Sequence, residues 1–195
     1  MSSPEQAAGD TLLLRTHGTV PEEEARAREL CRRVLDATCP FVKKVHLAAE
    51  RLSHEGYQVV VVGEAGHPEV EATLPHAPGA VVVGSAQEAA GLPYARKVGV
   101  VVQTTARRAL LAEVVEELLA HAEEVRVINT ICEATAGHQS AADELAREAD
   151  VMVVIGGRNS ANTTRLAEIS AARCPRTHHV EGDDELRAEW SRARA

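Results

Sequence analysis

Apolar and polar positions alternate along the chain in blocks that predict strands followed by helices. Short β-branched or leucine-rich runs predict strands, and longer stretches with apolar residues at helical spacing predict helices. The predicted strands cover residues 11–15, 34–36, 58–62, 80–83, 97–102, 125–129, 151–155 and 178–180. The predicted helices cover residues 21–32, 40–54, 86–90, 106–121, 134–149 and 162–172. This alternation is typical of α/β units with parallel sheets, which is the fold class we expect.

One unit of this pattern occurs twice, each time around a cysteine. The run from Val34 to Cys39 matches the run from Val127 to Cys132, with Asp or Asn three residues before the thiol. In both copies a helix and an apolar strand follow, and a glycine stands 24 residues after the cysteine. Four and six residues beyond that glycine lie two polar side chains, which are His67 and Glu69 in the first copy and Ser160 and Asn162 in the second. The duplication predicts two pseudo-repeated lobes of parallel sheet flanked by helices.

Composition and charge exclude several kinds of partner. Only four residues are aromatic, so few rings are present to stack on bases. The formal charge of −8 also disfavours binding to phosphate backbones or anionic membranes. The first residues lack the basic flank and apolar core of a signal peptide, and no apolar run approaches the ~20 residues that span a bilayer. We therefore expect a cytoplasmic protein without a nucleic-acid or membrane partner. In that compartment four cysteines are more often thiols or metal ligands than disulfides.

Chemically reactive side chains gather at the carboxyl ends of the predicted strands. In open α/β sheets, ligands bind at these ends. The residues found there are His17, Cys39, His67, Glu69, Gln103, Thr104, Cys132, Ser160 and Asn162. We expect them to form one site.

The cysteines each have two interpretations. Cys39 precedes Pro40 at a predicted helix start, and a helix N-terminus stabilises the thiolate of a nucleophile or of an iron or zinc ligand. The alternative is a small buried hydrophobic residue. The matching position of Cys132 favours the ligand interpretation for both. Cys31, inside a predicted helix, and Cys174, at a helix end, are expected to be structural.

The polar loops are open to two interpretations as well. Glycines at 63–66 and 156–157 let backbone amides face an anion, but any tight turn also favours glycine. His67 and Glu69 offer an imidazole and a carboxylate able to bind phosphate and move a proton, although a His-Pro turn alone is usually a surface loop. The remaining histidines have no metal-ligand spacing, and we expect them to be structural.

With these residues in hand, the chain resembles the hydroxymethylbutenyl diphosphate reductases, the LytB family. The matching stretches are 15–18, 36–46, 66–71, 103–105, 129–135 and 156–163. They follow the family's order from about residue 11 to the end. The resemblance implies a three-lobed α/β fold around an oxygen-sensitive 4Fe–4S cluster held by one cysteine per lobe, with Cys39 and Cys132 as two of the three ligands.

The resemblance also implies an activity and a substrate site. The family reductively removes the hydroxyl of hydroxymethylbutenyl diphosphate, giving isopentenyl and dimethylallyl diphosphates at the end of the non-mevalonate isoprenoid pathway, with electrons from a donor such as ferredoxin or flavodoxin. Carried over, the residues that hold the diphosphate are His17, His67, Ser160 and Asn162. Thr104 binds beside the substrate's hydroxyl, and Glu69 supplies the proton.

The chain departs from the family pattern in three places. It lacks the Gly-Phe-Cys segment with the third cluster ligand and a further histidine, it lacks the Ala-Gly-Ala-Ser stretch, and Ala161 replaces a serine. We therefore expect residues 1–36 to be the remainder of a first lobe, 37–124 a second lobe and 125–195 an incomplete third lobe. Cys31 is an improbable substitute ligand, because its helix lies on a flank of the sheet.

Three interpretations of function follow. The first is a truncated reductase, inactive or nearly so as an isolated chain, because two thiolates hold a cluster less well than three. The second is a non-catalytic protein that binds diphosphate or a metal, for example zinc on Cys39, Cys132, His17 and His67. The third is one half of a split enzyme, completed by another polypeptide or a second copy. An apolar surface where the first lobe should pack also predicts self-association.

Overall fold

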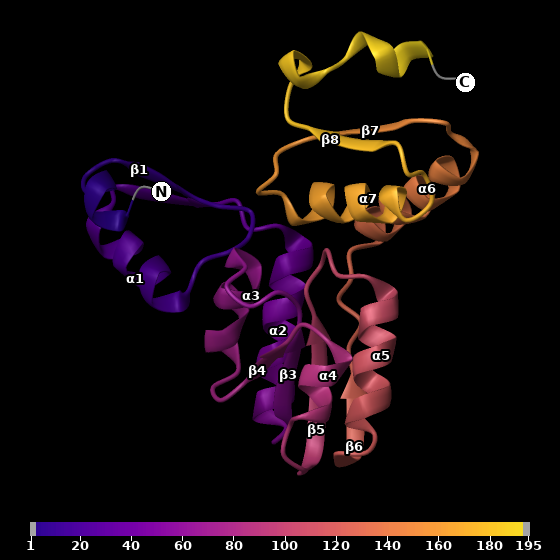
Figure 1. Cartoon of the computed structure of the whole chain (residues 1–195). Coiled ribbons are helices and arrows are strands. Elements are labelled where there is room, and N and C mark those ends of the chain that lie inside the picture. Colours follow the sequence, from indigo (N-terminus) through magenta and orange to yellow (C-terminus); the bar gives the residue numbers. More distant parts are fainter. Residues whose placement is uncertain (1–2, 193–195) are drawn as a thin grey trace. The chain divides into compact units, whose positions relative to one another are not determined.

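The computed structural model describes residues 3–192, which fall into two units, Met1–Ile131 and Cys132–Ala195. Parallel strands alternate with helices in both units, as the sequence predicts (Figure 1). The first unit holds a two-stranded sheet, β1-β2, and a four-stranded sheet in the order β4-β3-β5-β6. The second unit holds the two-stranded sheet β7-β8.

The first segments of the chain form a small sheet covered by one helix. A short 3-10 helix, η1 (Pro4–Ala7), precedes β1 (Thr11–Leu14), α1 (Pro21–Leu30) and β2 (Arg33–Asp36). Proline at the first helical turn and three glutamates behind it favour the start of α1. The helix ends at Leu30, so Cys31 is its C-cap residue with extended backbone. The predicted continuation to Arg32 is wrong.

The four-stranded sheet forms the core of the first unit. Its strands are β3 (Gln58–Val62), β4 (Val81–Val83), β5 (Ala95–Val102) and β6 (Ala122–Val127), and every neighbouring pair is parallel. Val60 and Val62 of β3 pack on one face, while Val59 and Val61 pack on the other. Successive side chains of a strand point to opposite faces, so an unbroken valine run suits a sheet covered on both sides.

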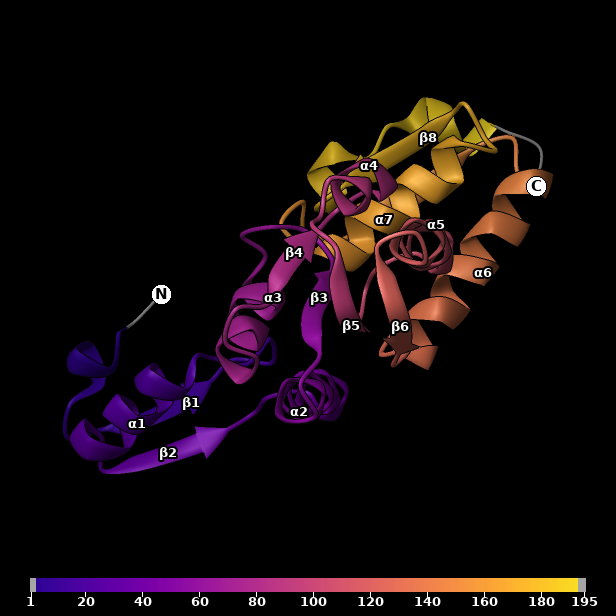
Figure 2. The same ribbon diagram turned by 90° about the horizontal axis from the view of Figure 1, so that it is seen from below.

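Helices cover both faces of this sheet (Figure 2). One face carries α2 (Pro40–His54) and α3 (Pro68–Thr73), followed by the 3-10 helix η2 (Leu74–His76). The other carries α4 (Ala86–Ala90) and α5 (Arg108–Leu118). A Cβ at Gly99 of β5 would lie 2.9 Å from a methyl of Leu52, so the glycine lets α2 approach the sheet closely. The sequence did not predict α3, which is only six residues long.

The second unit consists of α6 (Glu133–Glu148), β7 (Met152–Ile155), α7 (Ala161–Ala171) and β8 (Thr177–Val180). Two 3-10 helices follow, η3 (Asp183–Glu185) and η4 (Ala188–Arg192), in a region for which no element was predicted. The Trp190 ring stacks on His178 at 4.0 Å between centroids, which ties this last segment to β8. Ile155 at the end of β7 is largely exposed.

The strand expected to open the third lobe belongs to the sheet of the first unit. β6 pairs with β5 in parallel register, with Val127 opposite Val100. The contacts of the chain therefore divide it after Ile131 rather than after residue 124. The division into three lobes stays a prediction. Within residues 3–192, no helix is both long enough and apolar enough to span a membrane.

Candidate functional site

In the first unit, the predicted site residues lie where strands end and helices begin. His17 follows β1, Cys39 follows β2, His67 follows β3 and Thr104 follows β5. The rings of His17 and His67 contact edge to face, with centroids 5.7 Å apart. The Cys39 amide donates to the carbonyl oxygen of Thr16 at 2.9 Å, which joins the two loops after the small sheet. The structure thus brings together predicted residues from separate strands.

Glu69 and Thr104 form a buried pair. The Glu69 side chain belongs to the first turn of α3, and the residue is only 2% exposed. Its Oε1 accepts a hydrogen bond from the Thr104 amide, and its Oε2 accepts one from the Thr104 hydroxyl, both at 2.7 Å. A buried carboxylate needs such partners, and here both come from one residue. The pair places a carboxylate in direct hydrogen-bond contact with a hydroxyl through which a proton can move.

His67 is held as a hydrogen-bond donor toward the site. It is the N-cap residue of α3, and its Nδ1 accepts from the Glu69 amide at 3.1 Å. An accepting Nδ1 carries no hydrogen, so the neutral ring bears its hydrogen on Nε2. Burial lowers the pKa of His67, the Glu69 carboxylate opposes this shift, and His17 adds to it. The ring therefore favours the neutral form, with Nε2–H free to donate to an anion.

Gln103 ties the loop after β3 to the end of β5. Its Oε1 accepts from the Glu64 amide and its Nε2 donates to the Thr105 hydroxyl, both at 2.9 Å. A Cβ at Gly63 would lie 2.8 Å from that Oε1, so the glycine is required for this close approach. The sequence placed Gln103 among the site residues, and the structure shows that it fixes the loop that carries His67.

The duplicated Asp or Asn has a structural role that sequence reasoning missed. Asp36 Oδ1 accepts from the Thr38 amide at 2.8 Å, and Asn129 Oδ1 accepts from the Ile131 amide at 3.1 Å. Both are side-chain turns that shape the backbone just before each cysteine. An ion pair with Lys43 and the Thr38 hydrogen bond lower the pKa of Asp36 to about 2. Both turns could have been predicted from the Asp or Asn three residues before each cysteine.

Thr130 is a second residue that sequence reasoning missed. Its hydroxyl is buried, accepts from the Val102 amide at 2.9 Å and donates to the Val102 carbonyl oxygen. It therefore substitutes for a ladder hydrogen bond at the end of β5, directly before Gln103 and Thr104. In the first copy of the repeat the matching residue is Ala37. Its backbone amide donates to the carbonyl oxygen of Leu14 instead.

The second unit presents its predicted residues at helix starts. Ser160 is the N-cap of α7, and its Oγ accepts from the Thr163 amide at 3.3 Å. The Oδ1 atom of Asn162 is buried and has no hydrogen-bond partner among the described residues. The Ser160 Oγ also accepts from the Thr163 hydroxyl at 3.1 Å. A buried, unpaired polar atom at a helix start is typical of a site that binds a polar ligand. Gly156 has a φ of 153°, and a Cβ there would lie 2.8 Å from the Thr163 hydroxyl.

The four cysteines divide into two pairs. Cys39 and Cys132 are the N-cap residues of α2 and α6, and both are half-buried free thiols. Cys31 lies against the Pro4 carbonyl oxygen at 3.8 Å, and Cys174 is buried. Thiols at helix starts suit iron or zinc, and the other two do not point to a ligand site. In the part of the chain that the structure describes, no three His, Cys, Asp or Glu side chains form a group able to hold a metal ion.

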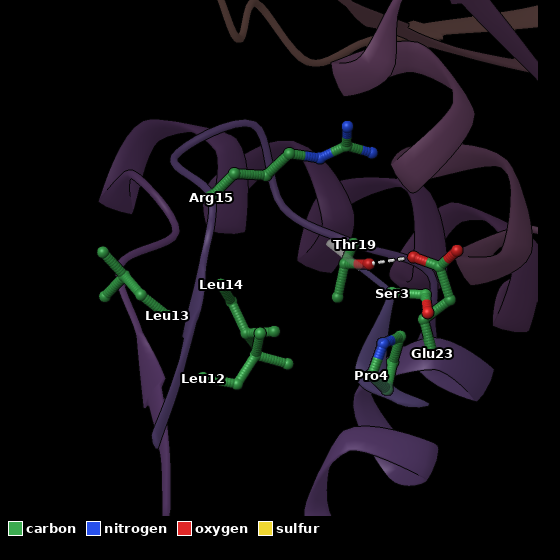
Figure 3. A pocket seen from close by; sticks show the side chains of 8 residues that line it. All are labelled: Ser3, Pro4, Leu12, Leu13, Leu14, Arg15, Thr19 and Glu23. Carbon is green, nitrogen blue, oxygen red and sulfur yellow. Dashed lines mark hydrogen bonds between the residues drawn. The ribbon is translucent and has the colours of Figure 1, made fainter. Parts of the chain in front are cut away.

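A pocket lies beside β1 (Figure 3). Its lining is Ser3, Pro4, Leu12, Leu13, Leu14, Arg15, Thr19 and Glu23. On one side of the pocket the Thr19 hydroxyl donates to Glu23 at 2.5 Å. None of the predicted site residues lines this pocket. Among the described strands, β1 pairs with β2 alone, so its other edge is open.

Fold and site together define a class of protein. It is an α/β protein whose parallel strands end in thiols, imidazoles and a buried carboxylate–hydroxyl pair. Comparison with known families specifies the class further. The family described as "LytB protein" matches residues 2–195, and the chain belongs to this family.

Relatives and solved structures agree with this assignment. The chain is 52% identical over 193 residues to 4-hydroxy-3-methylbut-2-enyl diphosphate reductase of Geobacter sulfurreducens, covering 97% of this chain and 68% of the relative. The reductase of Aquifex aeolicus is 45% identical over 188 residues, covering 94% and 65%. A solved structure of (E)-4-hydroxy-3-methyl-but-2-enyl diphosphate reductase, the terminal enzyme of the non-mevalonate pathway, matches with a TM-score of 0.66 and 45% identity, covering 98% of this chain and 70% of that one.

A reductase structure from Plasmodium falciparum, E-1-hydroxy-2-methyl-but-2-enyl-4-diphosphate reductase, matches with a TM-score of 0.86 and 26% identity, covering 96% of this chain and 61% of that one. The chain therefore spans about two thirds of the length of the relatives it matches. The family resemblance and the α/β fold class drawn from the sequence are confirmed.

Proposed function

We propose that this chain is part of a reductase that removes the hydroxyl of hydroxymethylbutenyl diphosphate, giving isopentenyl and dimethylallyl diphosphates. The observation that carries the proposal is the buried Glu69–Thr104 pair at the same end of the fold as the His17–His67 contact. One pair has the chemistry of a proton donor, and the other has the chemistry of an anion site. The relatives from Geobacter sulfurreducens and Aquifex aeolicus are both 4-hydroxy-3-methylbut-2-enyl diphosphate reductases, which supports this substrate.

The diphosphate group is held by hydrogen-bond donors. His67 donates from Nε2, since its Nδ1 is occupied by the Glu69 amide. His17, exposed on the loop after β1, provides a second imidazole. Ser160 and Asn162 of the second unit add a hydroxyl and an amide, which are good partners for phosphate oxygens.

The departing hydroxyl receives its proton from the Glu69–Thr104 pair. The carbon–oxygen bond breaks as two electrons and two protons are taken up, and the oxygen leaves as water. When Glu69 holds a proton on Oε2, the Thr104 hydroxyl, 2.7 Å away, accepts that proton and donates its own hydrogen to the substrate's hydroxyl. A hydroxyl that both donates and accepts suits this relay.

Cys39 and Cys132 are the residues that would hold a 4Fe–4S cluster. Their chemistry fits, because iron–sulfur clusters are bound by thiolates and both cysteines are half-exposed helix N-caps. When bound, the cluster supplies the two electrons, which it receives from a donor such as ferredoxin or flavodoxin in the cytoplasm. Cys31 and Cys174 face the Pro4 carbonyl and the interior, so neither provides a third ligand. We therefore expect the isolated chain to be inactive or nearly so.

Binding and chemistry are tested separately. Isothermal titration of the chain with hydroxymethylbutenyl diphosphate should show binding that His17→Ala and His67→Ala each weaken about tenfold, the cost of one lost hydrogen bond to a charged group. His54→Ala, an exposed histidine of α2, serves as the control. Absence of binding by the unaltered chain contradicts the proposal.

Anaerobic reconstitution with iron and sulfide then separates the remaining interpretations. We expect little 4Fe–4S signal by Mössbauer or EPR spectroscopy from the isolated chain, and further loss on Cys39→Ser or Cys132→Ser. A weak cluster signal that both substitutions remove supports the truncated reductase. Complete absence of a cluster in a chain that binds the diphosphate indicates a non-catalytic diphosphate-binding protein, or half of a split enzyme if a partner polypeptide restores the cluster. Full reductase turnover by the isolated chain contradicts the expected inactivity.

A further inference from the structure

The loop that carries His17 rests on a histidine that has no part in the proposed chemistry. Gly18 is buried and has a φ of 78°, a conformation that favours glycine. A Cβ at Gly18 would lie 2.8 Å from Cε1 and 3.4 Å from Nε2 of His46. The backbone of the turn and the His46 ring are therefore in direct contact, with no space for a side chain between them.

The His46 ring is fixed by packing. His46 lies on α2, is 8% exposed, and stacks on the ring of His76 with centroids 4.4 Å apart and planes 19° apart. Its Nε2 is buried and has no hydrogen-bond partner among the described residues. Contacts with Gly18 and with the ring of His76 therefore set the position of the His46 ring. The flat shape of the side chain matters more for this position than a hydrogen bond at Nε2.

We propose that His46 is a positioning residue for His17. The ring of His46, supported by His76, holds Gly18 and so fixes the turn from which His17 reaches the ring of His67. Three segments that are distant in sequence, the loop after β1, helix α2 and η2, are thereby linked to the anion site. The link to diphosphate binding rests on the proposed function, whereas the link to the His17–His67 contact does not.

The decisive measurement is the contact between His17 and His67 in the ligand-free chain. In a histidine-labelled sample, nuclear Overhauser effects between these two rings should be present in the unaltered chain and lost in His46→Ala. Val45→Ala is the matched control, because Val45 is a buried neighbour on α2 that packs toward the sheet. It should lower the melting temperature as His46→Ala does and leave the ring contact intact.

Two further variants keep the test informative if His46→Ala does not fold. His46→Phe keeps a flat ring on His76 and should retain the contact, and His76→Ala removes the support from behind and should weaken it. Persistence of the contact in folded His46→Ala or His76→Ala, or its loss in Val45→Ala, overturns the proposal.

Titration with inorganic diphosphate then relates positioning to binding. We expect about a tenfold weaker affinity for His46→Ala and for Gly18→Ala. The double variant should lose no more affinity for diphosphate than the single variant with the larger loss, because both substitutions disturb the same contact. Losses that multiply overturn the proposed link between Gly18 and His46. If the unaltered chain does not bind diphosphate while the ring contact still depends on His46, the proposed function fails and the positioning role stands.

Discussion

At the scale of single residues, buried polar groups in the first unit are paired very specifically. Glu69 has both carboxylate oxygens bonded to Thr104. The amide oxygen of Gln103 accepts from Glu64 in the loop after β3, and its amide nitrogen donates to Thr105 in its own loop. Removing one partner of a buried pair leaves the other polar group without a hydrogen-bond partner and out of reach of water. The resulting loss of stability is larger than the net contribution of the hydrogen bond. The stability of the chain should therefore be sensitive to these side chains.

The Glu69–Thr104 pair provides the first prediction. Glu69→Gln replaces one accepting oxygen with an NH₂ group that faces the Thr104 donors, so the free energy of unfolding should fall by about 1–3 kcal/mol. Thr104→Val should cost a similar amount, and the double variant should cost less than the sum of the two. Urea unfolding measures this, with Glu113→Gln on an exposed face of α5 as control. An unchanged midpoint in Glu69→Gln contradicts the pairing.

The buried His46 and the half-buried His67 provide a prediction on the pH dependence of stability. Burial, with a smaller contribution from His76, lowers the pKa of His46 to about 4, from 6.5 in an exposed histidine. The unfolded chain therefore binds more protons between these values, and stability should fall as the pH decreases from about 6.5 to about 4, by roughly 3 kcal/mol. His67, whose pKa is lowered in the same direction, adds to this dependence.

Urea unfolding at several pH values in this window tests the assignment. His46→Phe should flatten the dependence and leave only the part due to His67. His54→Phe, at an exposed position of the same helix, should leave the slope as it is. Equal slopes in His46→Phe and the unaltered chain contradict the role given to His46.

At the scale of elements, the two copies of the repeat begin their helices in the same way. A side-chain turn from Asp36 or Asn129 shapes the backbone, and Cys39 or Cys132 then becomes the N-cap. Neither cysteine side chain caps its helix, which leaves both thiols available. The repeat thus conserves a backbone geometry that presents a thiol at a strand end.

Substitutions at Asp36 should separate the turn from the ion pair. Asp36→Asn keeps the acceptor that Asn129 provides in the second copy and loses the pairing with Lys43, which at this partly exposed position should cost about 1 kcal/mol or less. Asp36→Ala loses the turn as well and should cost about 1 kcal/mol more. Because the Asp36 pKa is about 2, its contribution should be present above about pH 4 and lost as the pH falls toward 2.

High salt distinguishes these two contributions. In urea unfolding at high ionic strength, the difference between the unaltered chain and Asp36→Asn should shrink, while the difference between Asp36→Asn and Asp36→Ala should persist. Equal destabilisation by both variants would mean that the side-chain turn does not stabilise the chain.

At the scale of the whole molecule, the small sheet of β1 and β2 leaves apolar side chains exposed. Leu13 and Leu35 are opposite each other in β1 and β2, point to the same face, and are 64% and 38% exposed. Beside them lies the open edge of β1. Exposed apolar pairs and open edges are surfaces on which chains associate.

Self-association should therefore depend on this sheet. Size-exclusion chromatography with light scattering should show concentration-dependent oligomers of the unaltered chain that Leu13→Lys shifts toward monomer. Leu119→Lys is the matched control, because Leu119 is equally exposed, at 64%, but lies at the end of α5. A monomer at all concentrations, or equal effects of both lysines, contradicts this expectation.

The sequence by itself determined the order of the elements and the identity of the family. Valine runs with flanking helical patterns predicted most strands and helices, because burial on both faces of a parallel sheet requires unbroken apolar strands. Proline and acidic residues marked the start of α1, and the spacing of two cysteines exposed the repeat. These signals are local or periodic, so one sequence is enough to read them.

Only the tertiary structure decided which side chains act on one another. The Glu69–Thr104 pair, the loop held by Gln103, and the contact of Gly18 with His46 join residues far apart in the chain. Sequence reasoning also missed α3, whose six residues are too few to show a repeated helical pattern of apolar positions. It also placed β6 outside the sheet that includes it. Strand pairing and ring contacts depend on the packing of the whole unit, which no local pattern in the sequence specifies.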